Sequence, residues 1–92
     1  MNSGIVLEES LAMARSLVAR TDIDDAARVS AAYETCFARK PSAAETKRAL
    51  DAISQLERAY SSTEPDAAKR RERAWQSLCK SLIGSNEFCY VE

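Results

Sequence analysis

The sequence predicts an all-α fold, a compact bundle of four helices in a single domain spanning residues 1–92, with a C-terminal tail packed back onto it. The chain has only two Gly and two Pro among its 92 residues, whereas an all-β chain needs a turn about every 8–12 residues. Apolar residues also recur at spacings of three and four in four separate stretches, with helix-capping residues between them. Both observations favour helices over strands.

The first predicted helix covers residues 5–20, and Ser3 is its expected cap because a hydroxyl can accept a free amide hydrogen of the first turn. Its expected core stripe consists of Leu7, Leu11, Ala14 and Val18. The second predicted helix covers residues 24–39, with Asp22 or Asp24 as its expected cap, since acids suit the positive helix end. Its expected core face consists of Val29, Tyr33, Cys36 and Phe37.

The third predicted helix covers residues 43–61, where Ser42 and Glu45 form a capping box. Its expected core face consists of Leu50, Ile53, Leu56 and Tyr60. The fourth covers residues 65–83, with the same capping pattern at Thr63 and Asp66. Its expected core side consists of Ala68, Arg71, Trp75, Leu78 and Leu82.

The ends of the predicted helices are also marked in the sequence. Pro41 prevents continuation of the second helix, and Gly84 is expected to end the fourth through a positive φ. The links between helices are only about three residues long. Short links favour antiparallel neighbours, so we expect a compact up-down arrangement.

Composition excludes several kinds of chemistry. The chain has no histidine, which removes a histidine base, a histidine-paired nucleophile and histidine-ligated zinc or haem. The net charge of −1 gives no general attraction to nucleic acid or anionic lipid, and no apolar run approaches the roughly 20 residues of a membrane span. We therefore expect no catalytic residue, no metal, no cofactor and no nucleic-acid partner in this chain.

The three cysteines lack metal-ligand spacing. Cys36 and Cys79 fall on apolar helix faces, where a free cysteine acts as a small core hydrophobe. A disulfide between Cys79 and Cys89 is the alternative if the tail folds over the last helix. The basic run of residues 69–73 reads KRRER and has no interleaved aromatic residue, so it is interpreted as a solvated helix face. It can form ion pairs with Asp22, Asp24 and Asp25 if the helices lie close.

The tail after Gly84 carries Phe88, Tyr90 and Val91, which are costly to leave in water. We expect this tail to be structural and to pack on the last helix, on a missing upstream region, or on a second copy in a homodimer. The expected structural or interaction residues are Trp75, Leu78, Leu82, Asn86, Glu87, Phe88 and Tyr90.

Two stretches resemble a known family. The sequence from Trp75 to Glu92 has the form W-x-x-L-C-x-x-L-x-x-S-N-E-F-x-Y-V-acid. The stretch from Arg28 to Glu45 is similar to R-(I/V)-x-x-A-(Y/F)-x-x-x-L-G-R-x-P-(S/T)-x-x-E, but has Phe37-Ala38 in place of Leu-Gly. Together they resemble the C-terminal part of a domain of unknown function found in large exported planctomycete proteins, many of which carry cytochrome-c-like domains upstream.

The resemblance implies that these residues end a longer protein exported to the cell envelope or a periplasm-like compartment. It supplies no catalytic residues. The first hypothesis is a non-catalytic helical structural or interaction subdomain whose partner is the rest of the parent protein or another protein. The alternative is one wall of an enzyme active site, on a substrate such as a polysaccharide, whose catalytic residues lie upstream. A weaker third hypothesis is a nucleic-acid binder that uses the last helix.

Overall fold

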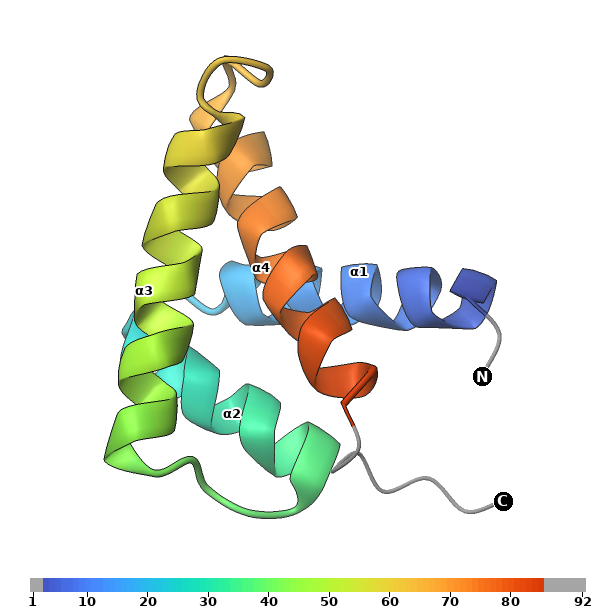
Figure 1. Ribbon diagram of the computed structural model, residues 1–92, viewed down its shortest axis with the longest axis vertical. Helices are drawn as coiled ribbons and strands as arrows, with labels where there is room; N and C mark the ends of the chain where they lie inside the picture. Colours follow the sequence, from blue (N-terminus) through green and yellow to red (C-terminus); the bar gives the residue numbers. More distant parts are fainter. Residues whose placement is uncertain (1–2, 86–92) are drawn as a thin grey trace.

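The structure, a computed structural model that describes residues 3–85, consists of helices joined by short links (Figure 1). The helices are α1 (Ser3–Ala19), α2 (Asp25–Phe37), α3 (Ala43–Tyr60) and α4 (Ala67–Ile83). Residues 3–85 contain no strand, so the predicted all-α bundle is confirmed. The predicted packing of the tail lies outside the described residues.

Helix α4 is the central element, because it packs against each of the other three and most extensively against α1. Figure 1 shows α3 and α4 running antiparallel, with α1 and α2 also running in opposite directions. The first pair crosses the second instead of lying alongside it. The up-down expectation therefore holds within each pair of helices but not between the pairs.

Local capping explains where α2 and α3 begin. Asp24 precedes α2, and its side chain accepts a hydrogen bond of 2.8 Å from the amide of Ala27. Ser42 precedes α3 and forms the predicted capping box: its hydroxyl accepts from the Glu45 amide at 3.1 Å, and the Glu45 carboxylate accepts from the Ser42 amide at 2.8 Å. These contacts satisfy amide groups that the first helical turn leaves without partners.

Three predicted helix ends are corrected by the structure. Helix α1 begins at Ser3 itself, so this residue does not precede the helix as a cap. Helix α4 is capped by Asp66 and begins at Ala67, while the Thr63 hydroxyl instead donates to the Tyr60 carbonyl at 3.4 Å. Gly84 has a φ of −81°, and the left-handed residue is Ala38 after α2, with a φ of 57°.

The core is built mainly from α2 and α4. Its buried apolar residues are Ala14, Leu17, Val29, Ala32, Tyr33, Cys36, Ala49, Ile53, Ala74, Trp75, Leu78, Cys79, Leu82 and Ile83. The predicted inward face of α2 is therefore correct, with Phe37 packed at the core's margin. On α3 only Ile53 of the predicted residues is buried, since Leu50 and Leu56 pack at the margin and Tyr60 is half-buried, and the buried Ala49 was not predicted. On α4 the prediction fails at Ala68, which is exposed because it lies in the first turn, beyond the crossing helices.

The predicted core stripe of α1 is only partly correct, because Ala14 is buried and Val18 packs against the core, whereas Leu11 is half-buried. The buried residues are Ser10, Ala14 and Leu17, while Leu7 is 47% exposed. Small side chains at two of these three positions let α1 approach α4 closely, and the buried Ser10 hydroxyl donates locally to the Leu7 carbonyl at 3.0 Å. Because Ser10 satisfies its hydrogen bond within its own helix, its burial carries little penalty.

Candidate functional site

Arg28 is a charged residue buried in the bundle, with its side chain only 8% exposed. Its Nε donates to the Leu17 carbonyl at 2.9 Å, and its Nη2 donates to the Arg20 carbonyl. Its Nη1 donates to Asp25 Oδ1 at 2.7 Å. One guanidinium thus binds carbonyl groups at the end of α1, where a cation is favourable, and joins this end to Asp25 in the first turn of α2.

Asp25 extends this network to α4. Arg71 Nη2 lies 2.6 Å from Asp25 Oδ1, which confirms the predicted pairing between the basic run of α4 and the acids that begin α2. The pKa of Asp25 is lowered, mainly by the hydrogen bond from Arg71. The positive charge of Arg71 and the hydrogen bond and charge of Arg28 lower this pKa further, while burial opposes the change. The same hydrogen bond raises the pKa of Arg71, and the Arg71 guanidinium carbon lies 5.9 Å from the centroid of the Trp75 ring.

A groove of about 440 Å³ opens beside this network, within the usual range for ligand sites. We call it the α3 groove. It is lined by Leu50, Ile53, Ser54, Glu57 and Arg58 of α3, Asp25 of α2 and Arg71 of α4. The apolar groups come from Leu50 and Ile53, and polar groups come from all three helices. The α3 groove is the strongest candidate site in the described part of the chain.

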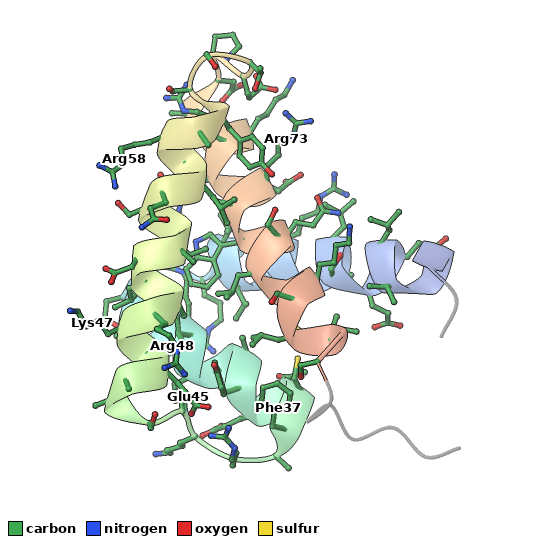
Figure 2. The ribbon with its side chains drawn as sticks, in the orientation of Figure 1. Phe37, Glu45, Lys47, Arg48, Arg58 and Arg73 are labelled. Atoms are coloured by element: carbon green, nitrogen blue, oxygen red, sulfur yellow. The ribbon has the colours of Figure 1, made fainter. Side chains whose placement is uncertain are left out.

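The charges around the α3 groove differ in how they are paired. Glu57 lies 3.6 Å from Arg71, and Asp25 contacts both Arg71 and Arg28. Arg58, in contrast, is exposed, and no carboxylate of residues 3–85 lies within ion-pair distance of it. Figure 2 shows its side chain extending from α3 into solvent. The rim of the groove therefore carries an available guanidinium.

A second charged contact holds the link between α2 and α3. Both terminal nitrogens of Arg39 donate to the Glu45 carboxylate at 2.8 Å, and the guanidinium carbon lies 5.5 Å from the Tyr33 ring centroid and 5.7 Å from that of Phe37. The Arg39 hydrogen bonds, together with the Ser42 amide, lower the pKa of Glu45 to about 2. The pairing and stacking hold the link between α2 and α3 in place.

The cysteines lie in the core, as the sequence predicted. Cys36 and Cys79 are both buried and free. Cys89, the other end of the alternative bridge from Cys79, lies outside the described residues. The Cys36 thiol contacts Met13 Sδ at 4.0 Å. Burial raises the pKa of Cys36, and burial together with the neighbouring Cys36 raises the pKa of Cys79 to about 12. Both groups are therefore protonated and poor nucleophiles at neutral pH.

The structure brings together only some of the residues predicted as interaction sites. Trp75, Leu78 and Leu82 share one face of α4 and are buried, with Trp75 fully inaccessible. They are core residues in this structure and offer no exposed surface to a partner. The other predicted site residues, Asn86, Glu87, Phe88 and Tyr90, lie outside the described residues.

Sequence reasoning missed the α3 groove, because its walls come from separate helices. One signal was present: Arg28 interrupts a run of small and apolar residues on α2, which indicates a paired buried cation. Nothing local marks Glu57 and Arg58, because both look like ordinary exposed helix residues.

Residues 3–85 contain no cluster of three or more acidic or cysteine side chains arranged to hold a metal ion. Among these helices, none combines the length and the apolar character needed to cross a bilayer. Comparisons with protein-family models, curated proteins and solved structures found no match to this chain. The planctomycete family resemblance therefore stays a prediction.

Proposed function

We propose that this chain is a non-catalytic helical subdomain that braces a larger exported protein, of the planctomycete family it resembles, or docks a partner on it. The observation that carries the proposal is the role of the residues that match the family pattern between Arg28 and Glu45. The polar residues of this pattern make hydrogen bonds and ion pairs that hold the helices together, and its apolar residues are buried in the core. None of them has the environment of a reactive group.

The polar pattern residues hold helices together. Arg28 donates to a backbone carbonyl at the end of α1, and Arg39 forms a bidentate ion pair with Glu45. Ser42 caps α3. The pattern has glycine where this chain has Ala38, and Ala38 adopts a left-handed conformation, which favours glycine. The apolar pattern residues Val29, Ala32 and Tyr33 are buried.

The alternative, one wall of an enzyme site, is favoured only by the two carboxylates of the α3 groove. Asp25 is poorly suited to acid-base catalysis. Its lowered pKa keeps it ionised, so it cannot donate a proton near neutral pH, and contacts from Arg28 and Arg71 occupy its oxygens. The sequence also offers no histidine to activate a nucleophile. These features support the non-catalytic proposal.

The buried thiols are compatible with the proposed location in the cell envelope. Oxidation proceeds through the thiolate and requires access, and Cys36 and Cys79 have neither. A domain with these thiols can persist in an oxidising compartment without forming a bridge from them.

The test requires two purified proteins. One is the upstream part of the parent protein, expressed without these 92 residues, and the other is the isolated chain; the two are then mixed. We expect the two to associate in sedimentation velocity, with a rise in the melting temperature of the upstream part. We also expect no polysaccharide hydrolysis by the isolated chain. Turnover by the isolated chain that is lost in Asp25→Asn or Glu57→Gln would overturn the proposal, as would an absence of association.

A further inference from the structure

We propose that the α3 groove binds a short extended segment of a partner protein that presents an aliphatic side chain next to a carboxylate. The inference rests on the proposed function, because it names the chemistry of the partner segment that such a subdomain docks. The aliphatic group would contact Leu50 and Ile53, and the carboxylate would bind Arg58 and Ser54.

The charges determine which ion the groove accepts. The groove is lined by two carboxylates, Asp25 and Glu57, and two guanidiniums, Arg71 and Arg58. Asp25 is also paired with the buried Arg28, which does not line the groove, so these five groups together leave one positive charge over. That excess resides on Arg58, which contacts no carboxylate of residues 3–85. A guanidinium binds a carboxylate through two parallel hydrogen bonds, and a ligand cation would instead have to displace Arg71 from its acids.

The shape of the groove determines the rest of the ligand. From Leu50 to Arg58, the lining follows α3 for about 12 Å, at about 1.5 Å per residue. An extended chain covers this length with roughly four residues. Ser54 lies one turn before Arg58, on the same side of α3, and its exposed hydroxyl makes no hydrogen bond to the rest of residues 3–85. The hydroxyl can therefore donate to the second oxygen of a carboxylate bound by Arg58.

The experiment titrates three short peptides into the isotope-labelled full chain and follows amide shifts by NMR. The probes are acetyl-Ala-Ala-Leu with a free carboxylate, its C-terminal amide, and acetyl-Leu-Ala-Asp-amide. The first and third distinguish a terminal carboxylate from a side-chain one, and the second is the neutral control. We expect binding with a dissociation constant on the order of 1 mM and shifts confined to the groove residues. The amide should bind roughly threefold to tenfold more weakly.

Arg58→Gln should weaken binding of the acid peptides by roughly the same factor, and Arg58→Lys should restore part of it. Arg48→Gln is the matched control, since Arg48 is an exposed cation of α3 that does not line the groove (Figure 2). Arg58 and Arg48 are both exposed, so their variants should melt like the parent chain. Equal binding of acid and amide, equal binding by Arg58→Gln, or shifts away from the groove would overturn the inference.

This result is separable from the test of the proposed function. If the chain still docks to its upstream region but binds no acid peptide, the inference fails and the proposed function stands. If acid peptides bind and docking is absent, the groove chemistry is supported while the bracing role is not.

Discussion

Replacing Arg28 by alanine should be among the most damaging polar substitutions in this domain. The change removes three hydrogen bonds from a charged donor, to the carbonyls of Leu17 and Arg20 and to Asp25. Charged hydrogen bonds contribute about 1.5–3 kcal/mol each. Two acceptors keep other donors, because Leu17 also accepts from the Arg20 amide at 3.2 Å and Asp25 keeps Arg71. We therefore expect a loss of about 3 kcal/mol, below the simple sum.

A domain of this size has a free energy of unfolding of about 5–10 kcal/mol, so the loss is a large share. The melting temperature should fall by about 12–24 °C, at roughly 4–8 °C per kcal/mol. Urea unfolding followed by the fluorescence of Trp75, the single tryptophan, measures the change directly. Arg28→Lys should lose less stability than Arg28→Ala but should remain less stable than the parent chain. The reason is that one ammonium group cannot reproduce the planar guanidinium, whose nitrogens reach three acceptors.

Arg20→Ala is the matched control. The Arg20 side chain lies 3.7 Å from Asp22, both are more than half exposed, and its backbone carbonyl is unaffected by the substitution. Exposed pairs of this kind contribute about 0.2–1 kcal/mol. If Arg28→Ala costs less than about 1 kcal/mol, or no more than Arg20→Ala, the reasoning that Arg28 holds α1 to α2 is refuted.

Substitutions at three further positions test other features. Ala38→Gly should raise the urea midpoint, by about 0.5–1 kcal/mol in stability, because Ala38 has a φ of 57°; an unchanged or lower midpoint would contradict the strain argument. Glu45→Gln should alter the pH dependence of unfolding. The pKa of Glu45 is lowered from 4.5 to about 2, so its contribution is full above pH 4.5 and is lost as the pH falls toward 2. The stability difference between parent and variant should therefore shrink over that range in acid titrations, and a constant difference would exclude the linkage. Trp75→Ala should cost about 3–5 kcal/mol in thermal melts, and Trp75→Phe clearly less. Phenylalanine fills most of the space and removes an indole N–H that has no hydrogen-bond partner among the described residues; equal losses in the two variants would contradict the argument that the cavity left by alanine causes the larger loss.

Local sequence determined where α2 and α3 begin. Asp24 and the pair of Ser42 and Glu45 cap their helices as predicted, because capping contacts span only three residues and need no tertiary contact. The start of α4 was misplaced because Thr63 and Asp66 are both good caps in isolation. The choice between them depends on the turn: the Glu64 amide donates to the Tyr60 carbonyl at 2.8 Å, and Arg70 donates to the Glu64 carbonyl at 2.7 Å.

The buried face of α1 was decided only by tertiary packing. Its apolar residues occur on more than one side, so helical periodicity does not select one face. Packing selected the side of Ser10, Ala14 and Leu17, where small residues admit α4, and left Leu7 exposed. The α3 groove likewise exists only after folding. Its charges, Asp25, Glu57 and Arg71, are separated by up to 46 positions in the sequence, and no local rule relates residues so far apart. They meet because α2, α3 and α4 each place one polar residue at the edge of a shared apolar core.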